Sequence, residues 1–498
     1  MLNRIKTVLC IILCISIFIC LSGCASKYEI EKVYYNESVP GGVTEYVEVP
    51  DGEEEILVKT PIEYEDDEAD IDDIDDTDDT SSDDTTFEKP VINKTYYVSS
   101  KGSDKNDGLS EKAPWKTISK VNSAEYFEGD KVLFCRGDEW RGETVQCAPG
   151  VSYGAYGDGA NPILTGSNKN YSVKSLWLET ATENVYKLNI KYKKSDDVGN
   201  IIFNDGEFCG IKVREGLDKL NEDLCFYHNV DGYVYLRCDN GNPASVYPII
   251  DIVTRQKLMV AKAKNTVENI TFRYANFGLT TSSNIPGEVN NVVVKNCKFM
   301  WIGGCSVQDD DTLRLGNAIE FWGCCYKMTV NNCEFTQIFD TAFTTQFTGN
   351  ATVDTVTVKN NKIDRCFWGM EFWLQGNGNS VMKNITVEGN TFTNTAQGWS
   401  ANQRWSSLII HGAHISDLGY KNFKRSNIVI KNNNFGNSGA MLLKLSGTNW
   451  SPVIEGNTYK QYKDKAFGYI FNKNYTYNDS FINSQLKKID KKAVASYQ

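Results

Sequence analysis

Histidine and the Cys-x-x-Cys spacing are what this sequence most conspicuously lacks. It has three His in 498 residues, and no Cys-x-x-Cys occurs beyond residue 24. Both absences argue against a zinc site. Eleven cysteines lie beyond residue 24, and an odd number in an exported chain argues against a complete disulfide framework. We therefore expect at least some of these thiols to be core residues.

Long apolar runs are also missing, apart from one at the N-terminus. Arg4 and Lys6 precede an apolar run over residues 8–21, and Leu-Ser-Gly follows it up to Cys24. The run is short for a membrane-spanning helix, which needs about 20 apolar residues, although an uncleaved helix is the alternative. Charged, apolar and small residues follow one another in the order of a secretory signal.

The end of this segment resembles the lipobox of bacterial lipoproteins. That resemblance implies a signal peptide over residues 1–24, lipidation of Cys24 and a membrane anchor. The protein would then be exposed outside the cytoplasm in the cell envelope.

Charge is divided very unevenly along the chain. The total is −12, but residues 51–88 hold nineteen acidic residues against Lys59, and residues 89–498 carry +7. Because a segment so acidic and so poor in apolar residues cannot bury a core, residues 25–91 are predicted to be a disordered tether. The mildly basic body would steer an anionic polymer only weakly. No EF-hand spacing supports calcium binding in the tether.

A repeat of about nine residues recurs in the C-terminal half. We aligned seven segments with starts 22, 36, 28, 29, 43 and 24 residues apart, at 269–277, 291–299, 327–335, 355–363, 384–392, 427–435 and 451–459. The short spacings fit one coil of a solenoid, and the long ones fit a coil with an inserted loop. Within each segment apolar and polar residues alternate, which is typical of half-buried strands.

The seventh position of the repeat predicts a polar ladder. It reads Ala275, Cys297, Cys333, Asn361, Asn390, Asn433 and Asn457. Stacked coils would place the four asparagines above one another, so that each amide bonds its neighbour. Cys297 and Cys333 share this column, which predicts buried structural thiols. The fold class predicted is all-β, a right-handed parallel β-helix with an N-terminal cap and a small β insertion.

Domain boundaries follow from where the repeat begins and breaks. We predict the cap and first coils over 92–170, the β insertion over 171–255, further coils over 256–475 and a C-terminal tail over 476–498. The cap should contain a strand over Lys131–Cys135 and a helical segment near Trp115. A solenoid needs such a cap because its end coil would otherwise expose an apolar cross-section.

A second strand in each coil carries the candidate chemistry. These strands are predicted over 317–322, 341–346, 369–374, 407–411 and 440–445. If Ile319, Phe321, Phe343, Met370 and Phe372 face inward, alternation turns Glu320, Trp322, Thr344, Gln346, Glu371 and Trp373 outward. His411 and Lys444 would continue this face, and Arg404 lies in a loop between two tryptophans that would form a wall of the same cleft.

Carboxylates beside aromatic rings are what a sugar cleft requires. Coils lie ~4.8 Å apart, so the backbones of Glu320 and Glu371, two coils apart, would be separated by ~9.6 Å. Inverting glycosidases hold their carboxyls ~6.5–9.5 Å apart. Asp340 lies between the two glutamates and is a closer partner for either. We expect Glu320 or Glu371 as the general acid, with Asp340 or the other glutamate as the base.

Less specific interpretations stay open for these residues. The glutamates could form ordinary surface pairs with Arg404, Lys421 or Lys424. Asp309, Asp310 and Asp311 could bind calcium, or could be polar loop residues. Lys421, Lys424, Arg425 or Lys444 could serve as the base of a lyase. No cofactor is required by the pattern, no nucleic-acid partner is expected, and a monomer is predicted.

Three segments carry a family resemblance. They are Gly-Asp-Lys-Val-Leu-Phe at 129–134, Gly-Asn-Ala-Ile-Glu-Phe-Trp-Gly at 316–323 and Phe-Asp-Thr-Ala-Phe at 339–343. From about residue 95 to 475 the chain resembles the pectate-lyase-like superfamily of β-helix proteins. The resemblance implies action on a polysaccharide. It leaves open a glycoside hydrolase, a lyase or uronate epimerase, and a non-catalytic glycan binder.

Overall fold

The computed structural model divides the chain into two units, Met1–Val91 and Ile92–Gln498. It describes residues 93–498 except 194–195, 215, 229–230, 282–288, 308–309, 376–378, 404–411, 418–423 and 447–450. The predicted signal peptide, Cys24 and the acidic tether lie outside the described residues. Within the described residues no helix is long and apolar enough to cross a membrane.

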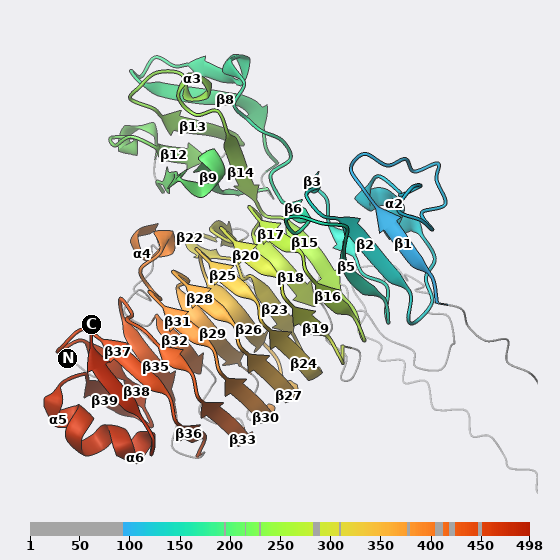
Figure 1. The fold of residues 1–498 in the computed structure, drawn as a ribbon. Helices are drawn as coiled ribbons and strands as arrows, with labels where there is room; N and C mark the ends of the chain where they lie inside the picture. Colours follow the sequence, from blue (N-terminus) through green and yellow to red (C-terminus); the bar gives the residue numbers. More distant parts are fainter. Residues whose placement is uncertain are drawn as a thin grey trace, which may run out of the picture. The chain divides into compact units, whose positions relative to one another are not determined.

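Three ten-stranded sheets wind around a common core, with strands stacked in register (Figure 1). Sheet A runs β1 (Thr95–Val98), β2 (Lys131–Cys135), β5 (Ser152–Tyr156), β16 (Thr266–Glu268), β19 (Val293–Lys295), β24 (Cys325–Asn331), β27 (Thr352–Lys359), β30 (Val381–Glu388), β33 (Lys424–Lys431), β36 (Val453–Glu455). Sheet B runs β3 (Glu139–Arg141), β6 (Ile163–Thr165), β17 (Thr271–Arg273), β20 (Lys298–Met300), β25 (Glu334–Thr336), β28 (Lys362–Asp364), β31 (Thr391–Thr393), β34 (Asn434–Phe435), β37 (Thr458–Gln461), β40 (Val494–Tyr497). Sheet C runs β4 (Val145–Gln146), β15 (Lys257–Ala261), β18 (Phe277–Thr281), β23 (Ile319–Trp322), β26 (Thr341–Phe347), β29 (Trp368–Leu374), β32 (Ala413–Asp417), β35 (Met441–Leu445), β38 (Ala466–Ile470), β39 (Lys473–Thr476).

Alternation along each strand explains why the coils close on one core. In β27, Val356 and Val358 are buried while Thr357 and Lys359 are partly exposed. Equivalent residues stack from coil to coil, as the rings of Phe272, Phe299 and Phe335 do at centroid distances of 4.7 and 5.1 Å. Burying such columns removes apolar area from water in every coil. The prediction of an all-β solenoid is therefore confirmed.

The register corrects the first segment of the repeat. Thr266 pairs with Val293, and Thr271 with Lys298, so the segment equivalent to 291–299 begins at residue 264 rather than 269. Ile270, not Ala275, therefore precedes Cys297 in the seventh column. The alignment was wrong because Asn269 begins a run of alternating residues much like the one at Asn291. Strand pairing with the next coil, together with the stacking of Phe272 on Phe299, decides between the two registers.

The asparagine ladder is present as predicted. Asn361 donates to Asn390 at 2.9 Å, Asn390 to Asn433 at 3.0 Å and Asn433 to Asn457 at 2.9 Å. Cys297 and Cys333 lie in the same column, and both are buried. Burial raises the pKa of the Cys297 thiol well above its ordinary value. All eleven cysteines in the described residues are free, and nine of them are buried.

Near the N-terminus the solenoid begins with a cap and is then interrupted by a small β domain. In the cap, α2 (Ile118–Ser123) starts at Thr117, whose hydroxyl accepts from the amide of Lys120. Between β6 and β15 the chain leaves the solenoid to form one five-stranded and one three-stranded sheet (Figure 1). Their elements are η1 (Lys174–Leu176), β7 (Trp177–Glu179), β8 (Val185–Lys191), β9 (Val198–Phe203), η2 (Asn204–Gly206), β10 (Phe208–Cys209), β11 (Ile211–Lys212), η3 (Leu217–Lys219), β12 (Cys225–His228), β13 (Tyr233–Arg237), α3 (Pro243–Val246) and β14 (Ile250–Thr254).

The C-terminal residues form a structured end to the solenoid. Three short helical segments, α5 (Asp479–Phe481), η5 (Ile482–Leu486) and α6 (Lys487–Ile489), are followed by β40, which pairs with β37 in sheet B. Asp490 accepts from the side chain of Asn457 at 2.8 Å and so ends the asparagine ladder. The segment predicted as a tail thus covers the last coil.

Candidate active site

The candidate site is one column of residues on the outer face of sheet C. Strand pairing aligns Thr280, Glu320, Thr344, Glu371, Ser416 and Lys444 on consecutive strands from β18 to β35. The residues one position earlier in these strands, such as Phe343 and Met370, belong to the core. The predicted alternation is therefore correct, and Glu320 and Glu371 lie two strands apart with Thr344 between them.

One strand of this face was predicted in the wrong place. The position expected for residues 407–411 is taken by β32, Ala413–Asp417, which places Ser416 rather than His411 in the column. His411, Arg404 and Lys421 lie outside the described residues. The coil here has an inserted loop that includes α4 (Trp399–Gln403), and an alternating pattern alone does not locate a strand after a loop of this length.

Glu320 is held by two amide side chains. Its Oε2 accepts from Asn317 Nδ2 at 2.7 Å and from Gln346 Nε2 at 2.9 Å. The side chain is nevertheless almost inaccessible to water, and burial raises the pKa of its carboxyl above the ordinary value. The negative charge of Asp340 adds to this, while Asn317, Lys257 and Gln346 oppose it. A carboxyl that keeps its proton is suited to general acid catalysis.

A short chain of hydrogen bonds links the two glutamates. Asn317 Oδ1 accepts from the amide of Thr341 at 3.1 Å, and Thr341 Oγ1 donates to Glu371 Oε2 at 3.4 Å. Asp340, which immediately precedes β26, is also buried. The structure therefore brings Glu320, Asp340 and Glu371 into one region, which is buried although an open, outward-facing cleft was expected.

Lys444 lies in the column on the C-terminal side of Glu371, with Ser416 between them. Burial lowers the pKa of its ammonium, and the negative charges of Glu371 and Asp417 oppose this shift. Lys444 is therefore close enough to Glu371 to stabilise its carboxylate. Glu371 therefore has the positive charge of Lys444 nearby, whereas Glu320 has the negative charge of Asp340 nearby.

The predicted aromatic residues form a second column next to the first. Trp322 pairs with Gln346, and Gln346 with Trp373, so an indole lies on either side of the amide. All three side chains are half-buried. Indole faces left partly open beside carboxylates can pack on the apolar face of a sugar ring.

Sequence reasoning missed the residues that support the carboxylates. Asn317 and Thr341 were read as parts of strands, and Lys257, whose charge acts on Glu320, lies about sixty residues before it. Asn317 precedes Glu320 by three residues and lies just before β23, where its amide reaches forward to the carboxylate. Such a pairing depends on backbone direction at the strand entry, which no residue pattern specifies.

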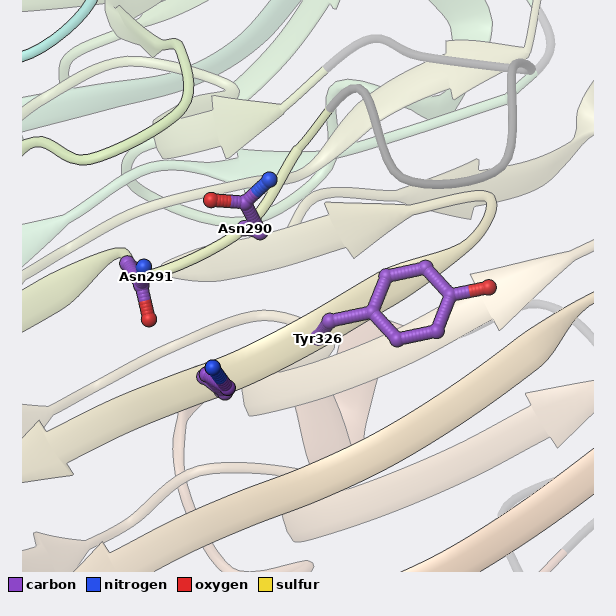
Figure 2. A pocket seen from close by; sticks show the side chains of 4 residues that line it. Asn290, Asn291 and Tyr326 are labelled. Atoms are coloured by element: carbon purple, nitrogen blue, oxygen red, sulfur yellow. The ribbon is translucent and has the colours of Figure 1, made fainter.

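A separate cavity of about 270 Å³ lies beside sheet A, lined by Asn290, Asn291, Tyr326 and Lys327 (Figure 2). Asn290 and Tyr326 are joined by an isolated parallel bridge. None of these four described residues is a carboxylate. We therefore place the candidate site on the column of sheet C.

The predicted calcium site falls partly outside the described residues. Asp309 is not described, and Asp310 begins β22 (Asp310–Leu315), which pairs with β21 (Cys305–Val307). No group of three or more metal-ligating side chains occurs in the part of the chain that the structure describes. Calcium binding stays a prediction.

Comparison with known proteins finds distant relatives. No family model matches the chain. Lacto-N-biosidase from Bifidobacterium longum is 31% identical over 152 residues, which are 28% of this chain and 9% of that protein. The chain thus spans under a tenth of that relative.

Solved structures with a similar course of the chain include enzymes that act on sugars. A complex of XylC with xylose has a TM-score of 0.47 and 12% identity, covering 77% of this chain and 73% of that one. The GH136 lacto-N-biosidase from Eubacterium ramulus has a TM-score of 0.36 and 11% identity, covering 81% and 68%. A protein described as a glycoside hydrolase has a TM-score of 0.40 and 10% identity, covering 81% and 96%. Likeness at this level says nothing about substrate or reaction.

Proposed function

We propose that the protein is a glycoside hydrolase whose active site is the outer face of sheet C. The observation that carries the proposal is the pair of buried carboxylates, Glu320 and Glu371, two strands apart in one column. Their backbones are separated by ~9.6 Å at ~4.8 Å per strand. The 31% identity to a stretch of lacto-N-biosidase supports action on a glycosidic bond.

Glu320 is the general acid in this proposal. Its pKa is raised by burial and by Asp340, which favours the protonated form that gives its proton to the glycosidic oxygen as the bond to the sugar breaks. The amides of Asn317 and Gln346 hold the carboxyl in one orientation. Asp340 acts through its charge on Glu320.

Glu371 is the general base. The ammonium of Lys444 favours its ionised form, and Thr341 orients one carboxylate oxygen. A carboxylate so placed can take a proton from water as the water oxygen bonds to the anomeric carbon. Trp322 and Trp373 pack on the sugar ring, with Gln346 bonding both Glu320 and sugar hydroxyls. Arg404 and His411 are proposed to complete the substrate contacts.

A lyase is the second candidate, and Lys444 favours it. Burial lowers the pKa of this lysine, and a neutral amine could remove the proton beside a uronate carboxylate. The two reactions differ in product mass, because a lyase leaves an unsaturated fragment lighter by one water. A glycan binder would release no fragment.

The location proposed is the outer surface of the cell envelope. Lipidation at Cys24 would anchor the mature chain, and the acidic tether would hold the solenoid away from the membrane because like charges repel. More than one acyl chain is needed for a stable anchor. Labelling with a radioactive fatty acid, lost in Cys24→Ala, tests the anchor.

The function is tested by incubating the full chain, purified in detergent, with a panel of glycans and identifying fragments by mass. The panel includes 4-nitrophenyl lacto-N-bioside. Saturated fragments support hydrolysis if the rate of their release falls at least about 10²-fold in Glu320→Gln and in Glu371→Gln. Glu388→Gln, at the end of β30 in sheet A, is the matched control and should retain activity.

Leaving-group dependence separates the acid from the base. Because 4-nitrophenolate leaves without protonation, Glu320→Gln should lose much less activity on the aryl glycoside than on an oligosaccharide. Glu371→Gln should lose activity on both. Unsaturated fragments would move the assignment to a lyase, and retention of a glycan without cleavage would leave a binder.

A further inference from the structure

Thr344 occupies the position between the two carboxylates. It pairs with Glu320 on one side and with Glu371 on the other, and its side chain leaves the strand on the same face as theirs. Its neighbours in the strand, Phe343 and Thr345, lie in columns with core residues such as Met370 and Phe372. Thr344 therefore lies between Glu320 and Glu371 in the column.

The hydroxyl of Thr344 has no hydrogen-bond partner among the described residues, although the side chain is fully buried. The nearby Thr341, by contrast, donates to Glu371. A buried hydroxyl that lacks a protein partner normally bonds to an ordered water or to a ligand. The Thr344 hydroxyl lies between the proposed acid, Glu320, and the proposed base, Glu371, which is where an attacking water molecule would bind.

We propose that the Thr344 hydroxyl holds the water molecule that attacks the anomeric carbon. This inference rests on the proposed function. In the step, Glu320 gives its proton to the glycosidic oxygen and the carbon–oxygen bond breaks. The water oxygen bonds to the anomeric carbon, and a water proton passes to Glu371. Exchange with solvent then returns the proton to Glu320 and removes it from Glu371.

The other unpartnered hydroxyls of sheet C do not have this position. Thr280 lies beyond Glu320, and Ser416 lies between Glu371 and Lys444, so neither stands between the two carboxylates. Thr345 is equally buried and unpartnered but lies in an inward column. Direct attack by bound water inverts the configuration at the anomeric carbon, so the inference also predicts an inverting reaction.

The experiment compares Thr344→Val, which keeps the shape and removes the hydroxyl, with Thr344→Ser and Thr345→Val in the full chain. Thr345→Val is the matched control on the same strand. The probe is 4-nitrophenyl lacto-N-bioside, or the best substrate of the panel if that is not cleaved. We expect kcat of Thr344→Val to fall about 10²-fold with KM unchanged, because water is misplaced and sugar binding is not.

Thr344→Ser should recover most of kcat, Thr345→Val should match the unaltered protein, and proton NMR of the first product should show inversion. Melting temperatures verify that all variants fold. Full activity of a folded Thr344→Val, or a product of retained configuration, overturns this inference while leaving hydrolysis intact. An unaltered protein that cleaves nothing overturns the proposed function and this inference together.

Discussion

The carboxyl group of Glu320 accepts two hydrogen bonds, although its surroundings disfavour its charged form. Two amides donate to it, yet burial and the charge of Asp340 still raise its pKa. The folded protein therefore holds the proton of Glu320 at pH values where the unfolded chain has released it. Stability must fall as the pH rises from the ordinary glutamate pKa through the folded-state pKa, and stay lower above it.

Replacement of Glu320 by Gln should remove this loss. We expect Glu320→Gln to melt at a higher temperature than the unaltered protein at pH 8, with the difference shrinking towards pH 4. Calorimetry across that range measures it. Glu388→Gln should behave oppositely, because hydrogen bonds from Lys359 and Lys431 and their charges lower the pKa of Glu388. Equal melting curves for Glu320→Gln and the unaltered protein would contradict the raised pKa.

His414 makes a second contribution to the pH dependence of stability, opposite in direction to that of Glu320. It lies fully buried against the rings of Phe392 and Phe435, and burial lowers its pKa to about 4, partly offset by a hydrogen bond to Gly436. The folded state therefore loses stability as the pH falls from about 6.5, the unfolded pKa, to about 4. A shift of this size corresponds to about 3 kcal/mol.

Substitution of His414 by Phe should flatten this part of the stability curve. We expect the unfolding free energy of His414→Phe to fall by about 3 kcal/mol less between pH 6.5 and 4 than that of the unaltered protein. Urea titrations at several pH values measure the difference. An unchanged pH slope would show that His414 titrates normally. Its absolute stability at pH 7 is a separate matter, since Phe leaves Gly436 and Thr395 without their bonds to His414.

At the scale of elements, the turn between sheets A and B is held by the asparagine ladder. Each asparagine serves its neighbours through both amide atoms, so that Asn390 donates to Asn433 and Val358 and accepts from the backbone and side chain of Asn361. The ladder begins at the amide of Cys333 and ends on Asp490. Adjacent coils are thereby locked in one register.

Removal of one member should leave several buried polar groups without partners. We expect Asn390→Ala to lower the unfolding free energy by about 3 kcal/mol, since an unsatisfied buried group costs about 1–3 kcal/mol. Denaturant titration provides the value. Asn434→Ala, an exposed residue of β34, is the control and should change stability by less than about 0.5 kcal/mol. Similar losses in both would mean that the ladder has no special role.

For the whole folded unit, Arg314 joins three parts of the chain. Its guanidinium is buried and donates to the carbonyl oxygens of Gly304, Gln403 and Gly199, which lie in a solenoid loop, in α4 and in the β insertion. It also lies over the ring of Phe339, 4.5 Å from its centroid. Phe339 precedes Asp340, so this contact connects the insertion to the candidate site.

Loss of Arg314 should loosen the attachment of the insertion. We expect Arg314→Met to destabilise the protein by about 3–5 kcal/mol, because three buried carbonyl oxygens lose their donor and each unsatisfied group costs about 1–3 kcal/mol. Hydrogen exchange should become faster in β9, β21 and β22 before it does in the later coils. Arg136→Met, in the first coils, supplies the comparison, because Arg136 is half-buried and bonds Asn161 and Gly159. Uniform loss of protection over all coils would contradict a local role.

Alternation and the recurrence of asparagine were enough to predict the coils, the ladder and the outward column of Glu320 and Glu371. Those features depend on side-chain period and on identical neighbours stacking, which are local properties of the chain. The register of β16 and the placement of β32 were wrong, because more than one stretch fits the pattern and only contacts with the coils on either side select one.

The chemistry of the site was decided by tertiary structure. Sequence supplied the carboxylates and tryptophans, but burial of Glu320, its bond to Gln346, and the approach of Lys444 to Glu371 arise only when coils stack. Likewise, no pattern marks Thr344 as the unpartnered hydroxyl between the two carboxylates. Charge and hydrogen bonding act over a few ångströms, and stacking brings together residues that are twenty to seventy positions apart in the chain.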